Sequence, residues 1–376
     1  MKKSTPPTTS RLMHLEAIRG AASLVVLLHH SSLAFAPWMK GSLDRIPFYW
    51  LVNGEGAVYL FFVLSGLVLT RGYMRGRNDR ADLLTAAFKR LPRLAVPAGV
   101  SILLSAILLR LGLTWHLEAG AISQSHWLLS YGNAELPPGY IPTMLGTLSQ
   151  TVSVFFYFGY IGLLNTNLWT MAPELFGSFL CFAIAWLYIA FRSREWLACV
   201  VALSTALVLG HILGTYAIPF MLGVGLALGL DEQKLRLPLW AGAVLIAVAL
   251  VLLSSGSYKR MLLGSVIMIA ASHVCPVIRE FLGGSIGRLL GAYSFPLYLV
   301  HPIVIFSVGS FAFSLLMRAG QPYILVLTIT FSLTIAASFA AAYPFALLER
   351  WWVPTLNRFS RRIRNWKGNA PIEVVH

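Results

Sequence analysis

Three observations predict that this sequence folds as an all-α membrane protein, a polytopic bundle of about ten transmembrane helices. Of its 376 residues 57% are hydrophobic and only 11% are charged, and the mean hydropathy is +0.72, which excludes an ordinary soluble domain and a disordered chain. Apolar stretches of about 16 to 25 residues recur along the chain, close to the length that a helix needs to cross a bilayer. The alternating ten-residue pattern of a membrane β-barrel is not found.

The predicted spans are apolar runs separated by charged or turn-forming residues. The first is expected to stay in the mature protein, because no small-residue cleavage site of a signal peptide follows it. The third is preceded by Pro92 and contains Pro97, residues that suit a helix start or a kink. In chain order the ten ranges are 12–36, 50–70, 94–113, 168–190, 195–211, 212–230, 237–254, 261–278, 289–315 and 323–348.

The distribution of basic residues predicts the orientation of the bundle. With ten spans and both termini in the cytoplasm, 22 of the 29 Lys and Arg residues lie inside, six outside and Arg19 in the membrane. An eleventh span at 148–164 would leave 13 inside and 15 outside, against the tendency of cytoplasmic loops to be basic. We therefore expect 148–164 to be re-entrant or interfacial, within an outer segment 111–167 that has no Lys or Arg.

One membrane domain, residues 12–348, accounts for most of the chain. Residues 1–11 are expected to form a cytoplasmic tail and residues 349–376 a basic cytoplasmic tail, and residues 71–93 form a basic cytoplasmic insert. The net charge is +15, and most of the basic residues lie on the predicted cytoplasmic side. We therefore attribute this charge to membrane orientation and to contacts with anionic lipid headgroups rather than to nucleic-acid binding. The sequence thus predicts a multi-pass protein of the cytoplasmic (plasma or inner) membrane.

Two ionisable residues inside the first predicted span indicate function. A charged side chain at mid-bilayer is costly, so such residues usually face a protein-lined cavity. Arg19 and His30 are eleven residues apart, which places them on one helix face and about 16 Å apart along the axis. His29 points about 80° away from that face.

Five motifs in the same order along the chain resemble the membrane-bound acyltransferase-3 family. The first, LEAIRGAASLVVLLHH (15–30), is similar to the family's opening motif with arginine and histidine eleven apart, and Glu16 replaces the usual aspartate. The others are FFVLSG (61–66), KRLPRLAVP (89–97) with its Arg-x-x-Arg pair, LWTMAPELF (168–176) and GAYSFPLYLVHP (291–302). The extracytoplasmic hydrolase-like domain that some members carry is missing, so this chain resembles the membrane-only form.

The resemblance implies acyl transfer from acyl-CoA, with acetyl-CoA as the expected donor, to a hydroxyl group. His30 is the expected general base, since an imidazole accepts a proton near neutral pH. Glu174 is expected to orient His30 or to stabilise its imidazolium. Guanidinium groups suit the phosphates of the coenzyme, and the arginines expected to bind them are Arg19, Arg90 and Arg93. The residues expected to support the site or contact substrate are Ser65, Trp169, Tyr298 and His301, and no metal site is predicted.

Each of these assignments has a structural alternative. His30 could be a neutral histidine bonded between helices, and Glu174 a member of a structural ion pair. Arg19 could pair with Glu16, which precedes it by about one helical turn. Ser65 stands before Gly66, where small residues usually permit close helix packing rather than supply a nucleophile. His301 fits a hydrogen bond between helices as well as it fits a role in the site.

Two other functions compete with the O-acyltransferase prediction. A secondary transporter also carries intramembrane charge along a polar pathway, but the sequence shows no repeated halves. A glycan flippase or polymerase would be expected to have charged outer loops, whereas the main outer segment lacks Lys and Arg. The expected acceptor is a glycan, a lipid-linked sugar or a secondary metabolite, and the sequence is compatible with an oligomer.

Overall fold

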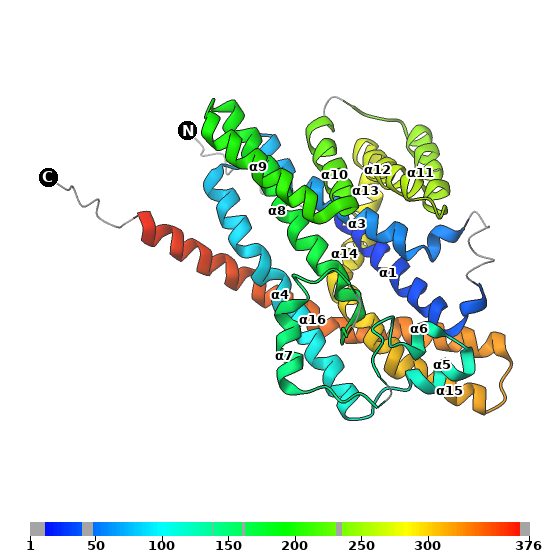
Figure 1. Ribbon diagram of the computed structural model, residues 1–376. Coiled ribbons are helices and arrows are strands. Elements are labelled where there is room, and N and C mark those ends of the chain that lie inside the picture. Colours follow the sequence, from blue (N-terminus) through cyan, green and yellow to red (C-terminus); the bar gives the residue numbers. More distant parts are fainter. Residues whose placement is uncertain (1–11, 40–47, 138, 160–161, 231–234, 369–376) are drawn as a thin grey trace.

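The computed structural model describes residues 12–39, 48–137, 139–159, 162–230 and 235–368, with side chains up to residue 360. These residues form helices joined by turns and irregular segments, without a strand (Figure 1). The whole predicted tail 1–11 and the end of the C-terminal tail, 369–376, lie outside the described residues. The α-helices are α1 (Met13–Phe35), α3 (Gly54–Met74), α4 (Arg80–Arg110), α5 (His116–Ser123), α6 (His126–Leu129), α7 (Met144–Ser153), α8 (Met171–Arg192), α9 (Trp196–Leu213), α10 (Ala217–Gly229), α11 (Leu239–Leu253), α12 (Tyr258–Val274), α13 (Pro276–Leu282), α14 (Ser285–Val304), α15 (Ser310–Arg318) and α16 (Tyr323–Gly368).

Each of the ten predicted spans falls on a helix, but fewer helices meet the length of a membrane span. Among the described residues seven helical runs are long and apolar enough, or eight if the bent pair α12 and α13 counts as one span. The predicted spans 195–211 and 212–230 share one of these runs, Trp196–Gly229, and α11 has only 15 residues. The chain is therefore a multi-pass helical membrane protein.

Local sequence signals explain where several helices begin. The side chain of Asn53 accepts a hydrogen bond from the backbone of Gly56 and so caps α3, while its amide donates to the carbonyl of Leu253 at 2.7 Å. Asp79 and Asp82 form a reciprocal capping box at the start of α4. Because these caps satisfy backbone donors that a helix end leaves unpaired, they fix the starting points of the two helices.

Two helices extend beyond their predicted limits. Helix α4 starts at Arg80, so Arg90 and Arg93 lie inside it, and Pro92 and Pro97 are interior residues and do not mark its start. Helix α16 continues through 46 residues to Gly368, so the region predicted as a tail from residue 349 is helical as far as it is described. Charged residues end the apolar run in both cases, but they do not end the helix.

The predicted outer segment 111–167 is partly buried in the bundle. Helix α7 reaches only to Ser153, and the described residues after it form turns and irregular structure, so 148–164 does not form a membrane-length helix. A short 3-10 turn, Thr166–Thr170, then leads into α8 with Asn167 only 2% exposed. The first turn of α8 is therefore enclosed by the protein.

The centre of the bundle is built on close helix contacts. Helix α1 packs along α14, and α3 packs along α10 (Figure 1). Gly20 of α1 lies against the backbone of Leu290, since a Cβ there would stand 2.3 Å from its carbonyl oxygen. Small residues of this kind let two membrane helices approach closely.

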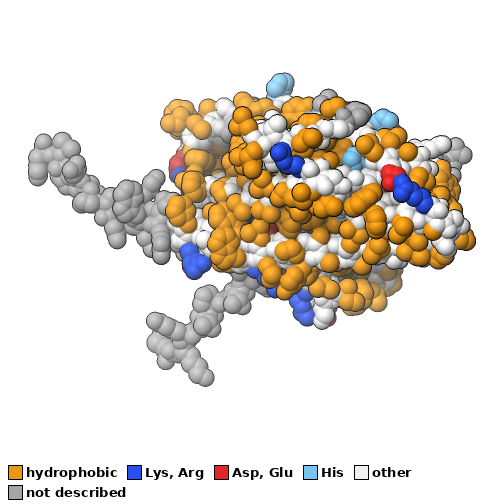
Figure 2. All heavy atoms as spheres, turned by 90° about the horizontal axis from the view of Figure 1, so that it is seen from below, with side chains coloured by type: hydrophobic (Ala, Val, Ile, Leu, Met, Phe, Trp, Pro, Cys, Tyr) orange, Lys and Arg blue, Asp and Glu red, His pale blue; other side chains and the backbone are white. Residues whose placement is uncertain are grey.

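Much of the outer surface is apolar. Figure 2 shows one face on which hydrophobic side chains predominate and Lys and Arg are few. Phe281 and Trp240 are 82% and 73% exposed. Large apolar patches of this extent are expected where hydrocarbon chains replace water as the solvent.

The crossing of α3 and α10 gives a first testable expectation. A Cβ on Gly66 would stand 2.2 Å from the carbonyl oxygen of Phe220, and one on Gly223 would stand 2.2 Å from that of Val63. Gly66→Ala and Gly223→Ala should therefore each destabilise the protein by about 1–3 kcal/mol through overpacking. Thermal unfolding of the purified protein in detergent measures the effect.

A matched control lies on the same helix. Nothing comes within 4 Å of a Cβ built on Gly225. Gly225→Ala should leave the melting temperature unchanged or raise it slightly, because alanine favours a helix more than glycine does. Equal loss of stability at Gly225 and Gly223 would contradict the packing explanation.

Candidate active site

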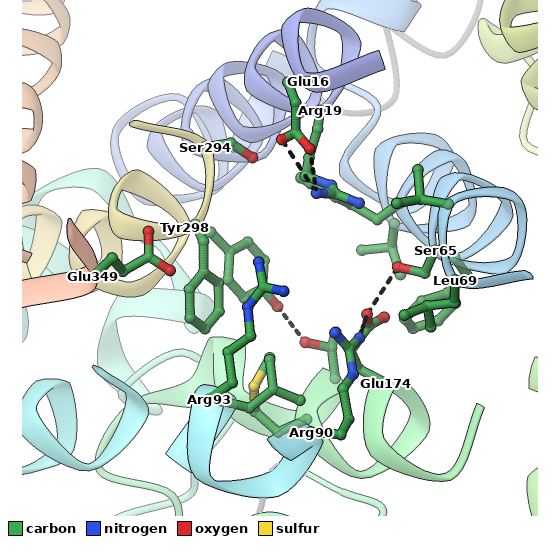
Figure 3. A pocket seen from close by; sticks show the side chains of 18 residues that line it. Glu16, Arg19, Ser65, Leu69, Arg90, Arg93, Glu174, Ser294, Tyr298 and Glu349 are labelled. Carbon is green, nitrogen blue, oxygen red and sulfur yellow. Dashed lines mark hydrogen bonds and ion pairs between the residues drawn. The ribbon is translucent and has the colours of Figure 1, made fainter. Parts of the chain in front are cut away.

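A cavity of about 300 Å³ lies between six helices and collects most of the charged residues predicted for the site. Figure 3 shows their side chains converging on it from α1, α3, α4, α8, α14 and α16. Three arginines and three glutamates line it together with polar and aromatic groups, namely Arg19, Arg90, Arg93, Glu16, Glu174, Glu349, Ser65, Thr170, Phe61 and Tyr298. Residues far apart in the sequence thus meet in one polar cavity inside an apolar bundle.

Glu174 forms a buried ion pair with Arg90. Its Oε1 forms an ion pair with the guanidinium of Arg90 and accepts a hydrogen bond from Ser65 Oγ at 2.8 Å. Arg90 Nε also donates to Ser178 Oγ at 2.7 Å. Both charged side chains are largely buried, with exposed fractions of 10% and 15%. A buried pair of this kind is costly to break by removing one partner, because the other charge is then left without compensation.

Glu174 was expected to orient His30 or, alternatively, to belong to a structural ion pair. It pairs with Arg90 and shares the cavity with Arg19 and Arg93. The buried turn Thr166–Thr170 leads directly into α8, so the first turn of this helix, which carries Glu174, lies inside the bundle. No hydrogen bond or ion pair joins Glu174 to His30 in the described part of the chain.

The two other arginines differ in how far they are already paired. Arg19 contacts Glu16 at 3.3 Å, as its structural alternative predicted, yet it also lines the cavity. Its side chain is 23% exposed and that of Glu16 is 36% exposed. Arg93 has no hydrogen-bond or ion-pair partner among the described residues, although Glu349 shares the cavity with it. Figure 3 shows Arg93 extending from α4 into the cavity.

His30 lies apart from this cavity and is paired with His301. The Nδ1 atom of His30 is 3.0 Å from Nε2 of His301, and Nδ1 of His301 is 3.0 Å from the carbonyl oxygen of Leu297. A carbonyl can only accept, so in the neutral pair His301 donates through Nδ1 and accepts at Nε2, which makes Nδ1 of His30 the donor. The lone pair of His30 is then on Nε2, and this atom has no hydrogen-bond partner within the described residues.

Asn167 and Tyr298 connect the cavity with the histidine pair. The amide of Asn167 donates to Nε2 of His301 at 2.9 Å and to the carbonyl of Tyr298 at 3.0 Å. The hydroxyl of Tyr298 donates to the carbonyl of Asn167 at 2.6 Å, while its ring lines the cavity. A continuous set of polar contacts therefore runs from the cavity wall to His30.

Two residues of the site, Asn167 and Trp127, were not identified from the sequence. One residue that was predicted from it, Trp169, lies outside the cavity. Trp169 does not line the cavity, and its ring centroid is 5.9 Å from that of Tyr216. Asn167 was missed, although an asparagine just before an apolar run is a visible signal. Trp127, whose ring stacks on His30, carried no signal beyond its place in an aromatic outer segment.

His116 of the outer segment is an aromatic packing group rather than a charged one. Burial lowers its pKa to about 4, so its imidazole is neutral at physiological pH. Its ring packs on Tyr131 with centroids 4.9 Å apart. Within the part of the chain that the structure describes, no three His, Cys, Asp or Glu side chains converge as metal ligands would.

Comparison with known proteins agrees with the motifs. A family model described as an acyltransferase domain, of the acyltransferase-3 type, matches residues 14–343. Neither the curated proteins nor the solved structures gave a significant match. The matched region contains all five motifs and every residue of the cavity except Glu349. With this family model covering most of its length, the chain belongs to the membrane-bound acyltransferase-3 family.

Proposed function

We propose that this acyltransferase moves an acyl group, acetyl in the first instance, from cytoplasmic acyl-CoA to a hydroxyl of a glycan, a lipid-linked sugar or a secondary metabolite. One observation carries the proposal. Arg19 and His30 are on the same face of α1; Arg19 lines the arginine cavity, and His30 has a ring nitrogen without a hydrogen-bond partner among the described residues. Polar contacts connect the cavity wall with His30. The donor side would face the cytoplasm, with both termini there. The membrane would be the plasma or inner membrane.

The cavity suits the phosphates of the coenzyme. Arg93 offers a guanidinium that makes no contact with a described carboxylate, and Arg19 is only partly engaged by Glu16. Guanidinium groups bind phosphate through paired, charge-assisted hydrogen bonds. Arg90 has a different role in this proposal: neutralised by Glu174, it shapes the cavity wall and supplies little charge. The pantetheine arm would then bridge about 16 Å along α1 to reach His30.

His30 is the general base of the proposed reaction. Its Nε2 takes the proton from the acceptor hydroxyl as the hydroxyl oxygen bonds to the acyl carbon. The carbon–sulfur bond of the thioester then breaks, and the proton passes from His30 to the thiolate, so that free CoA leaves. His301 keeps His30 in the tautomer with a basic Nε2, the part that the third member of a catalytic triad plays.

The remaining predicted residues support the cavity. Ser65 donates to Glu174 and is therefore a wall residue, not a nucleophile, in this proposal. Tyr298 stands between the two halves of the site, where its ring would flank the acyl chain. Trp169 lies behind the wall and contributes packing through the ring of Tyr216.

An assay on the purified protein tests the proposal. The protein in detergent or nanodiscs should consume acetyl-CoA and release CoA when hydroxyl acceptors from the host cell envelope or metabolite extract are added. Mass spectrometry should find one added acyl mass on an acceptor, and the same mass should be missing from cells without the gene. Movement of a solute across proteoliposomes without CoA release would instead indicate a transporter.

A further inference from the structure

We propose that Trp127 is a positioning residue that holds the His30–His301 pair in its reactive arrangement. The inference rests on the proposed function, in which His30 is the base. The indole of Trp127 stacks on the imidazole of His30 with ring centroids 5.0 Å apart and planes inclined by 17°. Trp127 is only 6% exposed, and it belongs to the segment 111–167 that was expected on the outer side of the membrane.

Trp127 is held between α1, which carries His30, and the segment that directly follows α14, the helix of His301. One stacking partner is His30 of α1, and the other is Phe306, at 5.0 Å and 27°, on the π-helical segment Ile305–Gly309 that follows α14. Offset stacks of this kind lie in the favourable range for aromatic rings. The indole therefore fixes the spacing between α1 and the end of α14, and with it the hydrogen bond between His30 and His301.

Hydrogen bonds attach the segment around Trp127 to the end of α1. Ser125, the N-cap of α6, donates to the carbonyl of Leu33 at 2.6 Å and accepts from the backbone of Leu128. Ser123 donates to the carbonyl of Ala34 at 2.8 Å. Both carbonyls lie about one turn beyond His30, so the outer segment is anchored next to the base.

The chain directly after Trp127 has an unusual backbone. Tyr131, Asn133 and Glu135 are non-glycine residues with φ of 52°, 67° and 52°. Residues other than glycine rarely adopt this left-handed region, and each such residue costs free energy that its surroundings must offset. At Tyr131 a buried contact offsets this cost, since its ring stacks on Phe306 with centroids 4.3 Å apart. Strain of this kind collects at functional sites.

The stack has a chemical consequence for the proposed reaction. His30 becomes an imidazolium when it takes the acceptor proton, and an aromatic face attracts a cation most strongly where water is excluded. Trp127 does not line the arginine cavity, so it should act on the chemical step and not on donor binding. Loss of the indole should therefore lower kcat and leave the KM for acyl-CoA unchanged.

The test compares Trp127→Leu with Trp127→Phe in the full-length protein. Trp127→Leu should lower kcat about 10- to 30-fold, the size expected for losing a desolvated cation–π contact, and Trp127→Phe should restore most of it. Trp115→Leu is the matched control, because Trp115 belongs to the same outer segment and its ring packs at a tilt against Phe311 of α15 rather than against His30. Trp115→Leu should leave kcat and the KM for acyl-CoA near the wild-type values.

Labelling of His30 by diethyl pyrocarbonate, followed by mass spectrometry, needs no enzymatic activity. Removing the indole should uncover the ring, so His30 should react faster in Trp127→Leu and at the wild-type rate in Trp127→Phe. Unchanged labelling, or wild-type kcat in a folded Trp127→Leu protein, would overturn the inference. A parallel rise in KM and fall in melting temperature in both variants would also overturn it. If the wild type transfers no acyl group while labelling behaves as expected, the proposed function fails and the contact stands.

Discussion

Replacing His30 with alanine is expected to lower the rate of acyl transfer about 10²- to 10⁴-fold, the contribution of a well-placed general base. The structure sharpens the reason. The neutral pair with His301 leaves the lone pair of His30 on Nε2, so the substitution removes the proton acceptor itself. Binding of CoA should be nearly unaffected, because His30 does not line the arginine cavity. Initial rates of CoA release and equilibrium binding of CoA measure the two effects separately.

His29 provides the control for this prediction. It is the neighbouring histidine on α1, and its ring meets that of His30 edge to face with centroids 5.2 Å apart, but its Nδ1 is 2.7 Å from the carbonyl oxygen of Val52. His29→Gln retains a hydrogen-bonding side chain and should keep acyl transfer within a few-fold of wild type. Full acylation by His30→Ala in membranes, or equal losses at both positions, would remove His30 from the role of base.

Much of the site could be predicted because its residues are unusual for their surroundings. An arginine in an apolar run needs a cavity, and five motifs in family order pointed to the same set of helices. The structure brings six of those residues, Arg19, Ser65, Arg90, Arg93, Glu174 and Tyr298, to one cavity. It also joins His30 to His301, a pair that spacing alone could not have identified because it depends on how α1 packs along α14.

The pairing of Glu174 with Arg90 could not be predicted from hydropathy, and the cause is physical. Hydropathy treats each apolar run as a helix that starts at a membrane face. Here the turn Thr166–Thr170 is buried, and non-helical backbone is tolerated at depth where protein surrounds it. Asn165 and Asn167 satisfy carbonyls of α14 from this turn. Such contacts come from distant parts of the chain, so a window along the sequence does not reveal them.

Arg93→Ala is expected to weaken CoA binding about 10- to 100-fold, because a charge-assisted hydrogen bond contributes about 1.5–3 kcal/mol. The protein should lose little stability, since Arg93 forms no ion pair or hydrogen bond among the described residues and acts on Glu349 of the same cavity only through its charge. Arg90→Ala should behave in the opposite way. It leaves the carboxylate of Glu174 buried and unpaired, which should destabilise the fold by about 3–5 kcal/mol. Titration calorimetry with CoA and thermal unfolding separate the two outcomes.

Further variants distinguish a phosphate contact from a general effect of charge. Arg93→Lys keeps the positive charge but loses the bidentate hydrogen-bonding geometry of the guanidinium. The affinity of this variant for CoA should therefore lie between those of the wild type and Arg93→Ala. Arg110→Ala removes an arginine near the opposite end of α4, where it donates to the carbonyl of Pro142, and should not change CoA binding. If Arg90→Ala lost affinity without losing stability, Arg90 would be the donor-binding residue. Unchanged affinity in both Arg93→Ala and Arg90→Ala would exclude this arginine pair from the donor site.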